Sequence, residues 1–228
     1  LAASQGGLNT SMQRLSSGLR VNSAKDDAAG LAIAERMNAQ VSGMNVAVRN
    51  ANDGISLAQT AEGALGKIGE NLQRMRELAV QSANDTNGTQ DRTSLDDEFK
   101  QLAAENARVI ANTKFNSKDL LTGTGGAAGT FTFQVGANTS ADNQIAVVTT
   151  NIGSAMGAVT QGTTAAATLG TTVTGAYAAI SAIDASLNTV NSARSKFGAI
   201  QNRFDAVVSN VQLASENQAA SRARIMDA

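Results

Sequence analysis

The sequence predicts a mainly α-helical fold: a long antiparallel coiled coil or helical bundle with a small β-hairpin region at one end. Three observations support this prediction. The 228-residue chain contains no proline, so nothing removes a backbone donor from a long helix. Aromatic residues make up only 3%, which suits thin bundles packed by aliphatic side chains. Apolar residues recur every three or four positions in both flanks, whereas Asp142 is the only charged residue between positions 121 and 183.

The first long helix is expected from about Leu31 to Ser82, with Asp26 or Asp27 capping its start. Such a helix would be roughly 75 Å long and needs a partner along its apolar face. The face has the a/d spacing of a coiled coil, with one local slip between Ala58 and Leu65. Its members are Met37, Val41, Met44, Val48, Ala51, Ile55, Ala58, Ala61, Leu65, Ile68, Leu72, Met75 and Ala79.

A turn is predicted at 84–88, and a second helix is expected to start near Thr93 or Ser94 and to end before Asn116. Ser94 and Asp97 have a weak capping-box spacing. One face of this helix carries Leu95, Phe99, Leu102 and Val109.

The middle of the chain changes its period. Residues 130–135 alternate as in a strand, residues 144–150 are rich in β-branched side chains, and the segment between them is rich in turn formers. These features predict a β-hairpin. Residues 153–170 are a low-complexity run of Ala, Thr and Gly, for which we predict no firm structure.

The last flank restores the three-and-four spacing. Because the chain must turn back through the middle, this helix is expected to run antiparallel to the first. Its predicted seam is Ile180, Ile183, Leu187, Val190, Ala193, Phe197, Ile200, Phe204, Val207, Val211 and Ala214.

The composition excludes several kinds of chemistry. Without Cys there is no disulfide, thiolate zinc site or thiol nucleophile, and without His the commonest general base is missing. The net charge of −1 offers no basic patch for nucleic acid or an anionic membrane. Lys25, Asp26 and Asp27 are interpreted as capping and surface charge rather than a metal site. We therefore predict no catalytic site, cofactor or metal, and no nucleic-acid or membrane partner.

Six local sequences carry a resemblance that covers nearly the whole chain. They are RLSSGLRVNSAKDDAAG (14–30), RNANDGIS (49–56), AQTAEGAL (58–65), QRMRELAVQS (73–82), FQVGAN (133–138) and QNRF (201–204). In these segments, and in their order, the chain resembles the bacterial flagellins. The resemblance implies a secreted, extracellular structural subunit of the flagellar filament, whose partners are other flagellin subunits, a flagellar export chaperone and the flagellin-sensing Toll-like receptor of innate immunity.

The resemblance also implies a division of the chain. Residues 1–30 would be the remnant of a terminal helix with its connecting segment. Residues 31–120 and 171–228 would form the helical core domain, and residues 121–170 the hairpin and a short variable segment of that domain. The family has further helix before Leu1 and after Ala228, and these helices pair into the inner tube of the filament. We therefore expect the chain as written to be unable to polymerise.

One helix face allows two interpretations. From the residues alone it is a solvated face, weakly supported by Glu70 and Arg74 at i,i+4. The resemblance instead implies a receptor-binding surface, which in the family also contacts neighbouring subunits. The residues that match this surface are Gln73, Arg74, Leu78, Glu98, Ile183 and Leu187.

Two other classes of function remain as alternatives. The chain could be another coiled-coil assembly protein, such as the hook–filament junction protein or a secretion-needle component, but segment 58–64 and the position of the hairpin favour flagellin. It could also be an enzyme, since some flagellins carry a metallopeptidase in the variable region. That activity needs a His-Glu-x-x-His helix, and the sequence has no His.

Overall fold

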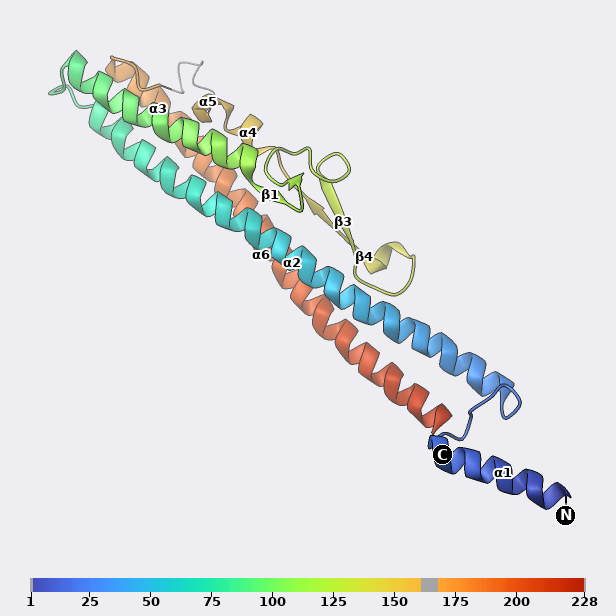
Figure 1. Ribbon diagram of the computed structural model, residues 1–228. Coiled ribbons are helices and arrows are strands. Elements are labelled where there is room, and N and C mark those ends of the chain that lie inside the picture. The colour runs from blue at the N-terminus through green and yellow to red at the C-terminus, as the bar shows by residue number, and fades with distance from the viewer. Residues whose placement is uncertain (1, 161–167, 228) are drawn as a thin grey trace. The chain divides into compact units, whose positions relative to one another are not determined.

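The structure, a computed structural model, describes residues 2–160 and 168–227 (Figure 1). Most of the described residues are helical, as predicted. The longer helices are α1 (Ala2–Ser17), α2 (Ala28–Ser82), α3 (Thr89–Asn112) and α6 (Val173–Met226). The chain forms two compact units, and each unit contains one section of α2 and one of α6. One comprises the chain up to Asn52, Gln134–Ile145 and the chain from Asp205 onward; the other comprises Asp53–Phe133 and Ala146–Phe204.

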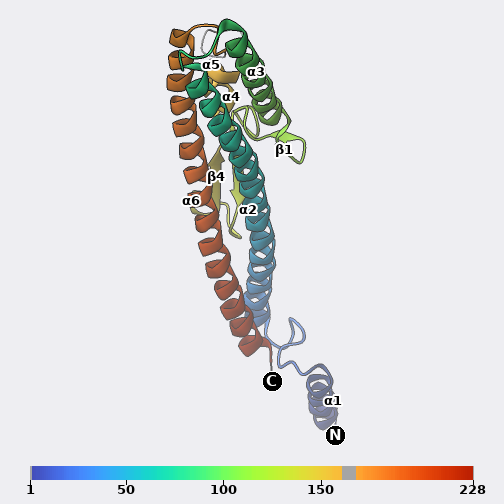
Figure 2. The same cartoon turned by 90° about the vertical axis from the view of Figure 1, so that its left-hand side faces the viewer.

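The second unit is a bundle in which sections of α2 and α6 pack with α3 (Figures 1 and 2). The two sections are antiparallel, because Arg76 meets Asp184 while Glu62, earlier in α2, meets Gln201, later in α6. The side chains of α2 form the continuous core that the heptads predict. Those with at most 1% exposure are Leu57, Ala58, Ala61, Leu65, Ile68, Leu72, Met75, Leu78 and Ala79.

Short strands complete this part of the chain. Strand β3 (Thr130–Gln134) pairs with β4 (Gln144–Val148), which confirms the predicted hairpin. A second hairpin, of β1 (Lys114–Phe115) and β2 (Lys118–Asp119), was not predicted, because two-residue strands leave no periodic signal. In the second unit, the ring of Phe133 meets that of Phe204 edge-on, with centroids 5.5 Å apart.

The first unit pairs the remaining sections of α2 and α6. Asn45 accepts a hydrogen bond of 3.2 Å from Ser215, and Gln40 accepts one from Gln218. The loop after β3 is fastened to α2, because the Asn50 amide donates to the Gln134 carbonyl at 3.0 Å. At the other end of the unit, Val21, Ala34 and Met226 form a small apolar cluster.

The helix boundaries differ from the predicted ones at two starts. Helix α2 begins at Ala28, where Asp27 caps it by accepting the Gly30 N–H at 2.8 Å. Helix α3 begins at Thr89, ahead of the predicted start, because Asp91 rather than Asp97 supplies the capping carboxylate, which accepts from Gly88 at 2.9 Å.

The low-complexity segment holds more structure than was predicted. Two short helices lie in or at the start of this segment, α4 (Ile152–Ala155) and α5 (Gly157–Thr160). A 3₁₀ turn, η1 (Ala141–Asn143), lies earlier in the chain, just before β4. The side chains of Ile152, Met156 and Val159 are at most 1% exposed, so burial orders a segment whose composition gives little local preference. The prediction for positions 161–167 lies outside the described residues.

Candidate interaction surface

A charged surface in the second unit is built around Arg74 of α2. The guanidinium reaches Oε1 of Glu98 on α3 through Nε at 2.9 Å and through Nη2 at 2.8 Å, and its Nη1 donates to Glu77 at 3.0 Å. The planar group thus ties two helices together while about half of each partner's side chain stays exposed. The predicted support from Glu70 is absent, because Glu70 pairs with Lys67 instead.

A second ion pair lies on the same stretch of α2. Nε of Arg76 donates to Asp184 of α6 at 2.8 Å. Glu98 and Glu77 raise the pKa of Arg74, and Asp184 raises the pKa of Arg76. Both arginines therefore stay charged at every physiological pH. A groove runs beside them, lined by Gln73, Arg76, Glu77, Val80 and Gln81.

The structure brings only part of the predicted receptor-binding set to this surface. Gln73, Arg74 and Glu98 are exposed, and Leu187 is half-buried. Leu78 and Ile183 have no exposed area, so they lie in the core and cannot contact a partner directly. Leu78 was not among the predicted seam residues, but it is part of the packed core. With α3 added to α6, a wider strip of α2 is covered than the two a/d rows of a helix pair.

Polar residues make up half of the buried face of α3, a feature the sequence analysis missed. The buried positions are Arg92, Asp96, Phe99, Ala103, Asn106 and Ile110, spaced alternately four and three apart. The spacing was visible in the sequence, but assigning the face by apolar residues alone selected Leu95, Leu102 and Val109, which are half-buried.

Each of these buried polar side chains has partners. Asp96 accepts from the backbone N–H of Leu169 at 2.7 Å and pairs with Lys100. Arg92 donates to the carbonyl of Asn84 at 3.0 Å, and Asn106 accepts from Asn71 at 2.8 Å. These bonds tie α3 to α2, to the turn that follows α2 and to the segment before α6, although Nε of Arg92 is buried without a hydrogen-bond partner among the described residues.

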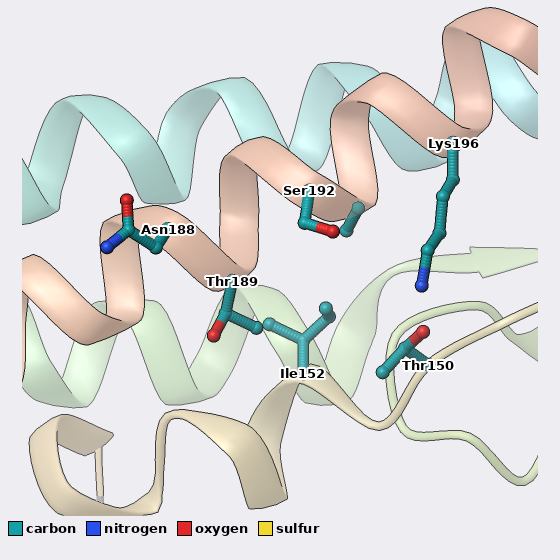
Figure 3. A pocket seen from close by; sticks show the side chains of 7 residues that line it. Thr150, Ile152, Asn188, Thr189, Ser192 and Lys196 are labelled. Carbon is teal, nitrogen blue, oxygen red and sulfur yellow. The ribbon is translucent and has the colours of Figure 1, made fainter.

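A cleft lies along α6 in the same unit (Figure 3). Lys196 extends from the helix toward Thr150, and Ile152 lies between Thr189 and Thr150 in this view. The remaining lining residues are Asn188, Ser192 and Ala193. The cleft adds hydroxyl and ammonium donors to the surface but contains neither a general base nor a paired carboxylate.

Metal ligands and membrane-spanning helices bear on the class of site. Among the described residues, no group of three or more His, Cys, Asp or Glu side chains is placed to hold a metal ion. None of the described helices combines the length and the apolar character needed to cross a bilayer.

Comparisons with known proteins agree with one another. The model of the bacterial flagellin N-terminal helical region matches residues 1–126, and that of the C-terminal helical region matches residues 180–228. The chain is 47% identical to a flagellin of Halalkalibacterium halodurans over 95% of its own length and 76% of the relative's. It is 56% identical to a B-type flagellin of Pseudomonas aeruginosa over 60% of its length, but this match covers only 28% of the relative.

Solved structures give the same picture. The crystal structure of Bacillus cereus flagellin aligns with a TM-score of 0.61 at 31% identity, covering 76% of this chain and 94% of that one. A putative flagellar hook-associated protein from Vibrio parahaemolyticus aligns with a TM-score of 0.70 over 89% of this chain, but at 16% identity it shows a shared fold alone.

Proposed function

Because this chain belongs to the bacterial flagellin family, a family of structural proteins rather than enzymes, we propose that it is the core of a subunit of the extracellular flagellar filament, which serves motility. The observation that carries the proposal is the 47% identity to a flagellin over 95% of the chain. The fold suits this role, because antiparallel sections of α2 and α6 form a continuous seam in each unit that can bear load along the helices.

The surface of α1 supports assembly with further helices. Leu8, Met12 and Leu15 are 61%, 61% and 88% exposed, at a four-and-three spacing that places them on one helix face. None of the described residues covers this face. Apolar residues in this pattern suit a coiled-coil partner, which in the proposed filament is another part of the subunit or a neighbouring subunit. Export through a dedicated chaperone follows from the same proposal.

A chimera tests the filament role. The chain would replace the matching 76% of the Halalkalibacterium halodurans flagellin, in a strain that lacks its own flagellin gene. Electron microscopy should show filaments, and the cells should swim.

A matched pair of variants sharpens this test. In the chimera, Leu15→Asp should abolish filaments by placing a charge on the exposed α1 stripe, whereas Gln13→Asp on the same helix should leave them intact. A chimera that is exported and folded but forms no filament would contradict the proposal.

We further propose that the charged surface around Arg74 binds the flagellin-sensing Toll-like receptor. The support is the resemblance together with the geometry. Gln73, Arg74 and Glu98 lie exposed on two helices, and the ion pair between Arg74 and Glu98 holds Arg74 in one orientation. A preorganised arginine suits a binding hot spot, because little rotamer freedom is lost on docking. Leu78 and Ile183 are buried, so their role is to support the surface from beneath, whereas the half-buried Leu187 contributes at its edge.

Surface-plasmon binding to the receptor ectodomain tests this role. Arg74→Ala should weaken binding roughly ten- to a hundred-fold, as hot-spot truncations do. Arg108→Ala is the matched control, because Arg108 is also an exposed arginine paired with a glutamate, Glu105, on α3. Circular dichroism confirms folding of both. Equal affinities of the two folded variants would remove this surface from consideration.

A further inference from the structure

The turn between α2 and α3 contains the only Asn-Gly pair in the sequence, Asn87-Gly88. An asparagine followed by glycine is chemically labile, because the backbone nitrogen of the next residue can attack the side-chain amide carbon. Glycine offers no side chain to hinder this attack and the widest choice of backbone angles for it. Gly88 is exposed and Asn87 is half-buried, so water reaches the pair.

Two hydrogen bonds restrain the reacting groups. The Gly88 N–H, which carries the attacking nitrogen, donates to Oδ2 of Asp91 at 2.9 Å. The Asn87 side-chain amide, which carries the leaving nitrogen, donates to the backbone carbonyl of Gln81 at 2.5 Å. Attack requires the first bond to break and the Gly88 nitrogen to lose its proton. A neighbouring carboxylate opposes that loss, because two negative charges would then face each other.

We propose that Asn87 is a latent site of spontaneous deamidation that the Asp91 cap of helix α3 holds closed. In the reaction, a bond forms between the Gly88 nitrogen and Cγ of Asn87, and the side-chain nitrogen leaves as ammonia with the proton lost from Gly88. The product is a five-membered cyclic imide. Water then opens the imide at one of its two carbonyls and leaves aspartate or isoaspartate at position 87. Water is the sole co-reactant, and nothing is oxidised or reduced.

The product changes the turn. A carboxylate at position 87 cannot donate to the Gln81 carbonyl, so that hydrogen bond is lost. The new charge stands near Asp85 in the same turn and Asp91 in the first turn of α3. Isoaspartate also adds one backbone carbon to the turn. Deamidation therefore loosens the connection between α2 and α3, and because the reaction is spontaneous its product accumulates with time.

The experiment compares deamidation rates at Asn87 by peptide mass spectrometry during incubation at mildly alkaline pH. Asp91→Ala should deamidate roughly ten-fold faster than the parent, since a hydrogen bond to a charged acceptor is lost. Asp97→Ala is the matched control, because Asp97 is an exposed aspartate of the same helix with no bond to Gly88, and its rate should equal that of the parent. Circular dichroism shows whether each variant is folded.

A second comparison does not depend on any variant folding. The parent chain should deamidate at Asn87 faster in urea than in its native state, because unfolding breaks both restraining bonds. Equal rates for the parent and a folded Asp91→Ala variant would overturn the protective role of the cap. An Asn87 that stays intact in the unfolded chain as well would overturn the site itself.

Discussion

The seams of the two compact units have the same heptad spacing, but their side chains are buried to different extents. In the second unit, the α2 seam residues Leu65, Leu72 and Met75 have no exposed area, because α3 packs there in addition to α6. In the first unit, the α2 seam residues Met37, Val41 and Val48 are only half-buried, although Met44 and Ala51 are buried. A sequence seam therefore fixes which side of a helix faces a partner, while the number of elements packed on it fixes how completely it is dehydrated.

Polar side chains make contacts inside both units. In the first unit, side-chain amides and a serine hydroxyl bond across the helix pair, as between Asn45 and Ser215. In the second unit, α3 carries three buried polar side chains, Arg92, Asp96 and Asn106, of which Asp96 accepts the backbone N–H of Leu169. Ser82, Thr149 and Ser186 are buried there as well. Most of the buried polar groups of the bundle bond to other protein groups, but Oγ of Ser82 and Nε of Arg92 are buried without a hydrogen-bond partner among the described residues.

The largest expected effect is a charge placed in the deeper seam. Leu72→Asp should lower the free energy of unfolding by several kcal/mol, because it buries an ion without a partner. Val41→Asp in the first unit should cost much less, since half-exposure lets its carboxylate stay hydrated. Thermal melts followed by circular dichroism measure both. The conservative surface change Glu70→Asp should leave the melt unchanged, and equal losses for Leu72→Asp and Val41→Asp would contradict the difference in depth.

The next effect tests the position that was wrongly assigned to the surface. Leu78→Ala should cost about 2–5 kcal/mol, as other large-to-small changes in cores do. Val80→Ala, two residues on and 51% exposed, should change stability by less than about 0.5 kcal/mol. Chemical denaturation gives both values, and a Leu78→Ala variant as stable as Val80→Ala would place Leu78 back on the surface.

Two glycines of α2, Gly54 and Gly63, test how closely α6 approaches α2 in the second unit. An added Cβ at Gly54 would lie 2.5 Å from Cζ of Phe204, so Gly54→Ala should cost about 1–3 kcal/mol. Nothing lies within 4 Å of a Cβ added at Gly63, so Gly63→Ala should stabilise by roughly 0.5–1 kcal/mol through helix propensity. The test is the sign of the shift in denaturation midpoint; shifts in the same direction for both would remove the packing argument.

The smallest expected effects are electrostatic, with one carboxylate in each unit. Ser23 lowers the pKa of Asp26 through hydrogen bonds, and Arg108 lowers the pKa of Glu105. A lowered folded-state pKa means that each carboxylate contributes stability at neutral pH, and that this contribution is lost as the pH falls through the lowered value. Both groups are solvent-exposed, so the contribution is slight.

NMR titration checks the two carboxylates directly. Ser23→Ala should raise the pKa of Asp26 toward that of an unfolded chain, and Arg108→Gln should do the same for Glu105. Each variant serves as the control for the other, because the two sites share no partner. A pKa that stays unchanged in its own variant would disprove the assigned cause.

The sequence by itself determined the architecture. Apolar residues at steps of three and four, together with the absence of proline, predict two long antiparallel helices, and the change of period after residue 130 predicts the β3–β4 hairpin. These features are readable because backbone periodicity is a local property. The exposed part of the candidate surface, Gln73, Arg74 and Glu98, was named from the resemblance to flagellins, whereas the residues alone indicate only a solvated helix face.

Only the tertiary structure decided which residues fill the seam. On α6 the structure buries the predicted seam residues Ile183, Val190, Ala193, Phe197 and Phe204. It also buries Ala176, Ala179 and Ser186, which were not predicted, while the predicted Ile180 and Leu187 are half-buried. Small residues let helices approach closely, and in a three-helix bundle the buried strip is set by the distance and direction of two neighbours rather than by the size of the side chain. The burial of Leu78 and of the polar row on α3 has the same origin. A third helix packs against the other two and excludes water from positions that the heptad pattern of a single helix does not mark as buried.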